Sequence, residues 1–187
     1  MGRPFRLTLA AALSAAALLA SGCGGEHEPI TSAHTEGIYL ELDELKYQVQ
    51  MSRYLNANDV EDRDYLVGLG ESTAQPAADE TWFGIFMRVE NVTDEPIMSA
   101  NEFEIHDTQQ NVYRPIPLDR ETNVFAYQPA EVPPHSKLPL PDSANDQTAI
   151  KGSLLLFRLK TSSLQNRPLE LRFRRGSGTE AVVDLDI

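Results

Sequence analysis

Cysteine is almost absent from this sequence of 187 residues, in which Cys23 is the single example. A folded domain after that position cannot contain an internal disulfide, so its stability must come from a buried hydrophobic core. A blue-copper centre is excluded for the same reason, because it needs a thiolate ligand inside the domain.

The short motifs of common enzyme classes are also missing. The chain has no Gly-x-Ser-x-Gly, His-Glu-x-x-His or Cys-x-x-Cys sequence and no glycine-rich phosphate loop. His106 and Asp107 are adjacent in a predicted strand, where neighbouring side chains point to opposite faces, so one cannot orient the other. We therefore expect a protein that is not an enzyme. A hydrolase that brings His135 and a distant serine together stays open as an alternative.

Basic residues are scarce, with 16 Lys and Arg against 28 Asp and Glu and a formal net charge of −12. Removal of residues 1–22, which include Arg3 and Arg6, would bring the charge to about −14. The sequence therefore excludes nucleic acid as a partner, because it offers no basic stripe to displace counterions. Direct contact with an anionic lipid surface is equally unfavourable.

The one long hydrophobic run lies at the N-terminus. Arg3 and Arg6 precede an apolar stretch over residues 7–20, which is typical of an export signal and is too short and alanine-rich for a membrane span. The run ends in Ala20-Ser21-Gly22-Cys23, which resembles a bacterial lipoprotein signal. An ordinary secretory signal that leaves Cys23 as a free thiol is the alternative.

This N-terminal pattern predicts where the protein is located. Residues 1–22 are expected to be a lipoprotein signal peptide, Cys23 to carry a covalent lipid, and residues 23–37 to form a flexible tether. The mature protein would be lipid-anchored to a membrane of the bacterial cell envelope, on its extracytoplasmic side.

The rest of the chain shows strand patterns. Trp82 to Glu90 is rich in aromatic and β-branched residues and predicts a strand buried on both faces. Phe103 to Asp107 and Val112 to Arg114 predict the next two strands, joined by a polar turn. Leu45 to Ser52 alternates, with Leu45, Tyr47, Val49 and Met51 on one face.

The C-terminal third adds a strong strand over Leu154 to Leu159, expected to be central, and a terminal hairpin over residues 169–187. These patterns predict one all-β domain over residues 38–187, an immunoglobulin-like antiparallel β-sandwich of about seven or eight strands with a short helical insertion. The expected core comprises Trp82, Phe83, Phe86, Phe103, Tyr113, Leu155 and Phe157.

One stretch of the sequence carries a family resemblance. A strand ending in V-x-N-x-T-x-x-P is followed by an F-x-I-x-D strand and by V-Y, here Val89, Asn91, Thr93, Pro96, Phe103, Ile105, Asp107, Val112 and Tyr113. This pattern resembles the immunoglobulin-like extracellular domains of the telokin-like and immunoprotective-antigen group of bacterial secreted proteins. The resemblance implies a sandwich fold and no general enzymatic activity.

A long insertion over residues 54–80 separates two predicted strands. Asp59 is expected to be the N-cap of a short helix that runs through Gly68. Calcium prefers six to eight oxygen ligands, and the insertion concentrates oxygen-bearing side chains. An ion-binding module that uses this acidic insertion is therefore an alternative function, with Asp59, Glu61, Asp62 and Asp64 as candidate ligands.

Residues 115–145 form a segment rich in proline, which regular strands can hardly cross. Exposed loops of this kind often carry binding residues. We expect Phe125 and Tyr127 here, with Tyr65 in the insertion, to contact a partner. The predicted function is a non-enzymatic binding or scaffolding module for another component of the cell envelope, such as an envelope protein.

Overall fold

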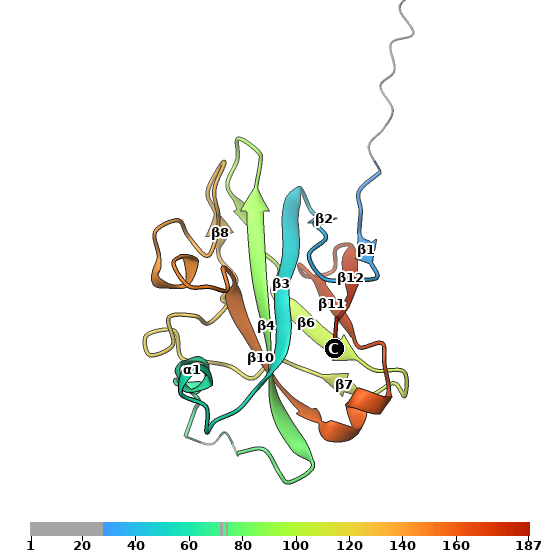
Figure 1. Ribbon diagram of the computed structural model, residues 1–187. Helices are drawn as coiled ribbons and strands as arrows, with labels where there is room; N and C mark the ends of the chain where they lie inside the picture. Colours follow the sequence, from blue (N-terminus) through green and yellow to red (C-terminus); the bar gives the residue numbers. More distant parts are fainter. Residues whose placement is uncertain (1–27, 72, 74) are drawn as a thin grey trace, which may run out of the picture.

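The computed structural model describes residues 28–71, 73 and 75–187 and shows two packed sheets (Figure 1). The β4 sheet has the order β10 (Ser153–Lys160), β4 (Glu80–Asn91), β3 (Leu45–Leu55) and β2 (Leu40–Leu42), and β9 (Lys137–Leu138) also pairs with β4. The β6 sheet has the order β1 (Ser32–Ala33), β12 (Glu180–Asp184), β11 (Glu170–Arg174), β6 (Glu102–His106) and β7 (Val112–Tyr113). The predicted antiparallel β-sandwich is confirmed.

The remaining elements are short. β5 (Ile97–Met98) pairs with β8 (Glu131–Val132), and the helical elements are α1 (Val60–Arg63), η1 (Asp64–Leu66), η2 (Ala144–Asp146) and η3 (Thr161–Gln165). Within the described residues, seven strands have three or more residues and five have two. The same residues contain no helix that is long and apolar enough to cross a membrane.

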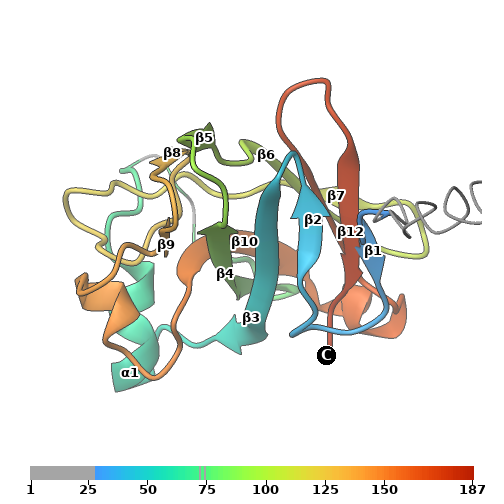
Figure 2. The ribbon, with the colours of Figure 1, turned by 90° about the horizontal axis from the view of Figure 1, so that it is seen from above.

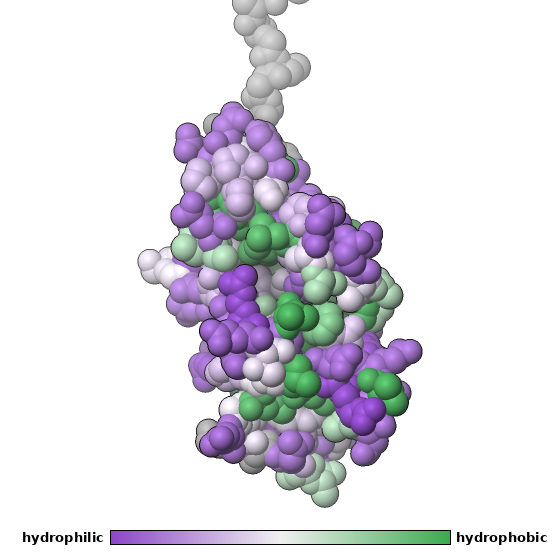
Figure 3. Space-filling view, turned by 90° about the vertical axis from the view of Figure 1, so that its left-hand side faces the viewer, coloured by the Kyte–Doolittle hydropathy of each residue, from purple (hydrophilic) through white to green (hydrophobic). Residues whose placement is uncertain are grey.

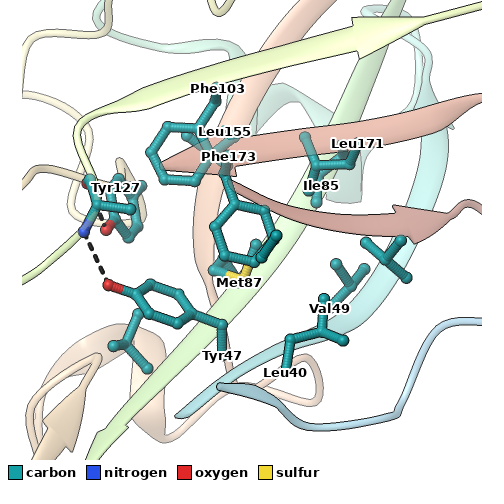
Figure 4. Packing of buried hydrophobic residues seen from close by; sticks show 14 of the residues in the cluster. Leu40, Tyr47, Val49, Ile85, Met87, Phe103, Tyr127, Leu155, Leu171 and Phe173 are labelled. Carbon is teal, nitrogen blue, oxygen red and sulfur yellow. Dashed lines mark hydrogen bonds between the residues drawn. The ribbon is translucent and has the colours of Figure 1, made fainter. Parts of the chain in front are cut away.

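The main core lies between the two sheets (Figure 4). The rings of Tyr47 and Phe173 meet at 5.1 Å, and those of Phe103 and Phe173 stack at 5.8 Å. The buried tyrosine hydroxyls are also satisfied, because the Ala100 amide donates to Tyr47 Oη at 2.8 Å and Tyr127 Oη donates to the Ala100 carbonyl at 2.9 Å. Each large side chain buried here contributes about 1.5 to 3 kcal/mol.

The strand β4 is buried on both faces, as its sequence predicts. Phe83 and Ile85 point into the main core, while Trp82 and Phe86 face the other side of the sheet. There they form a second cluster with Leu55, Leu154 and Leu156. The β4 sheet therefore needs a covering layer on its outer side.

Two strand predictions need correction. The register of β3 shifts between Val49 and Met51, so Met51 is 40% exposed and Ser52 is buried instead. A β-bulge reverses the alternation in this way, and nothing in the local sequence indicates it. β10 is not central, because it ends the β4 sheet and its outer edge is covered by Ile116, whose amide donates to the Leu156 carbonyl at 2.6 Å.

The domain begins before Ile38, so the predicted tether over residues 23–37 is wrong for its last part. β1 runs parallel to β12, and the Ile30 carbonyl accepts from the Glu41 amide at 2.7 Å. The Glu36 carboxylate accepts from the Ser52 amide at 3.0 Å and from the Asp186 amide at 3.1 Å. The signal peptide, Cys23 and the rest of residues 1–27 lie outside the described residues.

Candidate binding face

The predicted insertion covers the outer side of the β4 sheet. Asp59 caps α1, since its Oδ1 accepts from the Glu61 amide at 2.8 Å. The helical part is shorter than predicted, because α1 passes directly into η1, which ends at Leu66. Gly68 then turns the chain with a φ of +74°, a conformation that glycine adopts without strain.

Tyr65 joins the insertion to the sheet below it. Its ring meets Phe86 of β4 at 5.0 Å and Phe125 of the Pro-rich segment at 4.9 Å, both edge to face. The guanidinium of Arg53 lies 5.9 Å from the centre of the same ring. Burial raises the pKa of the Tyr65 hydroxyl. The structure thus brings two of the predicted partner residues, Tyr65 and Phe125, into one cluster.

Asn123 fastens the insertion to the Pro-rich segment. This fully buried side chain donates from Nδ2 to the carbonyls of Tyr65 at 3.0 Å and Val67 at 2.9 Å. Its Oδ1 accepts from the Phe125 amide at 3.0 Å. The Asp119 amide adds a hydrogen bond of 2.8 Å to the Gly68 carbonyl. The two segments therefore form one continuous layer.

The outward side of this layer exposes large hydrophobic side chains. We call it the insertion face and define it by residues 56–71, 115–130 and 133–145. It forms the left-hand side of the molecule in Figure 1, and Figure 3 shows several hydrophobic patches spread over it. The most exposed are Val60 at 69%, Val124 at 52%, Leu140 at 44% and Val67 at 40%.

A cavity of about 290 Å³ lies within the insertion face. Val124 and Ala126 line it from one loop and Leu138 and Leu140 from the other. Polar side chains reach it as well, namely Arg120, Gln128, Ser143, Asn145 and Ser153.

Tyr127 lies in one of the segments that define the insertion face, but its side chain packs into the main core and is not exposed on that face, so that part of the predicted partner site is wrong. Its side chain is 9% exposed and its ring meets Phe103 of the main core at 5.0 Å. Phe125 lies in a turn closed by the hydrogen bond of 3.2 Å from the Ala126 amide to the Asn123 carbonyl. Phe125 and Tyr127 therefore pack into different clusters. Sequence reasoning missed Val124 and Leu140, although large apolar residues in a Pro-rich loop are a usable signal for exposure.

The four candidate calcium ligands do not converge. Asp62 is buried at 4% exposure and is bonded to Arg53 and, at 2.8 Å, to the Asn56 amide. Asp59 is used as the helix cap, and Glu61 and Asp64 are exposed. The part of the chain that the structure describes contains no group of three or more His, Cys, Asp or Glu side chains that could hold a metal ion.

The histidines in the described ranges pair with carboxylates. His106 Nε2 lies 2.9 Å from the Glu104 carboxylate, two residues away on the same face of β6. In the described part of the chain the His106 ring makes no hydrogen bond to the Asp107 carboxylate. His135 Nε2 lies 2.8 Å from Asp94, and His34 Nδ1 lies 3.0 Å from Asp184. Across residues 28–71, 73 and 75–187, no histidine is hydrogen-bonded to a hydroxyl group. These contacts give no support to the hydrolase alternative.

No family model matches the chain, and no curated protein matches it. Among solved structures, the yjhA protein of Bacillus subtilis is similar over 82% of this chain and 100% of its own, with 13% identity and a TM-score of 0.47. An uncharacterized β-sandwich protein of Clostridium difficile 630 is similar over 86% of this chain and 97% of its own, with 12% identity and a TM-score of 0.43.

A third similar structure is ycdA, a candidate lipoprotein of Bacillus subtilis subsp. subtilis. It shares 10% identity with a TM-score of 0.45, over 84% of this chain and 39% of its own length. Similarity at these levels says nothing about function.

Proposed function

We propose that the chain is a non-enzymatic binding module, anchored to a membrane of the bacterial cell envelope, that holds another envelope component through the insertion face. The observation that carries this proposal is the exposure of Val60, Val67, Val124 and Leu140 on one face. A partner that covers such side chains gains about 25 cal/mol for each Å² of apolar surface removed from water.

The rigidity of the face supports the same role. Asn123 and the Asp119 amide fix the backbones of the two segments to each other. Proline residues restrict the loops further, among them Pro117, Pro129 and Pro139. A surface that is ordered before binding loses less conformational entropy when a partner docks. The insertion thus presents its hydrophobic residues in a fixed arrangement.

The anchor is proposed from the sequence. Ala20-Ser21-Gly22-Cys23 has the pattern in which the cysteine thiol receives a diacylglyceryl group after export. Buried acyl chains contribute about 0.8 kcal/mol for each CH₂, so two or more chains on one cysteine hold a protein on a membrane almost permanently. The acidic domain itself adds no attraction to an anionic lipid surface.

The anchor is tested by intact mass and detergent partitioning after expression in a lipidating host, with a Cys23→Ala copy as the control. We expect the parent to gain the mass of a diacylglyceryl group and to enter the detergent phase, while the variant stays in the aqueous phase. If both stay aqueous, the anchor is refuted and soluble ligands become the better candidates.

The binding face is tested by comparing what co-purifies from detergent-solubilised envelopes with the parent and with a Val124→Asp/Leu140→Asp double variant. Both positions are exposed, so the variant should fold normally and keep its circular dichroism spectrum. We expect one envelope component to be enriched with the parent and lost with the double variant. Equal recovery with both proteins would refute binding through this face.

A further inference from the structure

The cavity in the insertion face lies between the loop that carries Val124 and the segment from Leu138 to Asn145. Its volume of about 290 Å³ has room for about ten waters at about 30 Å³ each. This space suits one large aliphatic residue with its terminal groups. It is too small for a secondary-structure element.

Two deeply buried polar side chains line this cavity without a full set of partners. Ser153 is only 6% exposed, and its hydroxyl makes no hydrogen bond within the described ranges. Asn145 is 7% exposed and has one amide atom 2.7 Å from Ser143 Oγ, while its other amide atom has no partner in the same ranges. Neither atom is among the fully buried unpaired polar atoms of the described residues, so both are open to solvent in the cavity. They are available to hydrogen-bond a ligand that brings polar atoms.

The charge of the lining is unusual for this chain. No Asp or Glu lines the cavity, although the whole sequence has a net charge of −12. Its one charged residue is Arg120, which has no ion-pair partner in the described part of the chain. By contrast, the cavity of about 450 Å³ near the first strands is lined by three acidic residues and one basic residue, namely Glu41, Asp43, Glu44 and Lys46. A cationic group over apolar walls selects an anion with an apolar body.

We propose that this cavity binds the C-terminal residue of a partner polypeptide, with an aliphatic side chain between Val124 and Leu140 and the terminal carboxylate at Arg120 and Ser153. An aliphatic side chain and a carboxylate occur on the same residue only at the end of a peptide. The inference rests on the proposed function, because the partner held by the insertion face supplies this terminus.

The probe is the peptide acetyl-Ala-Ala-Leu with a free carboxylate, titrated at millimolar concentration into the ¹⁵N-labelled mature chain in detergent. Its C-terminal amide and 4-methylpentanoate are titrated in parallel. We expect the peptide with the free carboxylate to shift the backbone amide signals of Val124, Leu140 and Ser153. It should also bind about tenfold more tightly than the peptide with an amidated C-terminus. The simple acid lacks the peptide groups and should bind more weakly than the peptide.

Three variants make the test specific. Arg120→Gln should weaken binding of the peptide with the free carboxylate about tenfold and leave binding of the amidated peptide unchanged. Arg63→Gln is the matched control, because Arg63 is also exposed on the insertion face and does not line the cavity. Ala144→Phe places a ring at an exposed position of the lining, where folding should not suffer, and should abolish the shifts.

The inference is overturned if the peptide and its amide bind equally, if Ala144→Phe still binds, or if no shift appears. Equal or tighter binding of 4-methylpentanoate would identify a free aliphatic acid as the ligand and would also overturn it. A negative result here, together with loss of the envelope component in the Val124→Asp/Leu140→Asp variant, would leave the proposed function intact.

Discussion

At the residue scale, the insertion face depends on Asn123, whose side chain is fully buried and uses both ends of its amide. A side chain of another shape cannot donate to two carbonyls of the insertion and accept from the Phe125 amide. The sequence alone does not reveal this role, because Asn123 resembles any loop asparagine. The two carbonyls to which it donates lie about 60 residues earlier in the chain.

We predict that Asn123→Ala lowers the free energy of unfolding by about 2 to 4 kcal/mol, because it leaves buried backbone groups without partners. Hydrogen exchange should rise mainly over residues 60–69, which lose their connection to the Pro-rich segment. Asn58→Ala is the control, since Asn58 is exposed and should change stability little. Uniform exchange across the chain, or no loss of stability, would contradict the role given to Asn123.

Asp107 makes stability depend on pH. Burial raises the pKa of its carboxyl, but hydrogen bonds from Asn111, Asn166 and the Gln109 amide outweigh burial and hold the pKa below the usual value. Because the folded pKa is lowered, the stabilisation is complete above the unfolded pKa of about 4 and is lost as the pH falls through the folded pKa.

Urea unfolding from about pH 6 down to about pH 2 measures this effect. We expect Asp107→Asn to be less stable than the parent at the upper end, and the difference to shrink as the pH falls. Asp64→Asn, a change at an exposed carboxyl, is the control and should change the stability at about pH 6 little. Parallel curves for Asp107→Asn and the parent would rule out this contribution.

At the scale of elements, local patterns predict β4, β6 and the β11–β12 hairpin well, because alternation and burial on both faces are visible in consecutive residues. Features set by distant contacts are not predictable in this way. The bulge in β3 depends on pairing with β4, and β1 forms a parallel pair with β12, about 150 residues later. Polar residues such as Ser32 and Glu36 give no sign of that docking.

The candidate site was predictable in outline only. The insertion and the Pro-rich segment stand out by length and composition, and the structure brings Tyr65 and Phe125 together. Tyr127 shows the limit, since a turn that includes Phe125 directs the Tyr127 side chain into the other core. The carboxylates of the insertion also led to the prediction of a calcium site, but its candidate ligands do not converge, because Asp62 forms an ion pair with Arg53 within the fold.

The docked N-terminal segment gives a direct prediction at this scale. A chain that starts at Ile38 should be less stable than one that starts at Glu28 by at least about 2 kcal/mol, because it loses β1 and the Glu36 hydrogen bonds. Thermal and urea unfolding of both chains check this. Equal stability would mean that residues 28–37 are a passive tether after all.

At the scale of the whole molecule, the layers run from the insertion face through the β4 sheet to the β6 sheet (Figure 2). Because residues from Ile30 onward are docked, only six residues separate a lipidated Cys23 from the first docked position. A chain of this length spans at most about 20 to 25 Å. The proposed anchor would therefore keep the domain close to the membrane, and a partner must be reachable there.

The account is tested most directly by site-specific photo-crosslinking in cells that carry the lipidated protein. A photoreactive residue is placed either at Val124, which is 52% exposed on the insertion face, or at Val112, which is 41% exposed on β7 in the other sheet. We predict one discrete crosslinked species from Val124, lost when Cys23 is changed to Ala, and none from Val112. The same species from both positions, or none from Val124, would contradict a membrane-anchored module that binds through its insertion face.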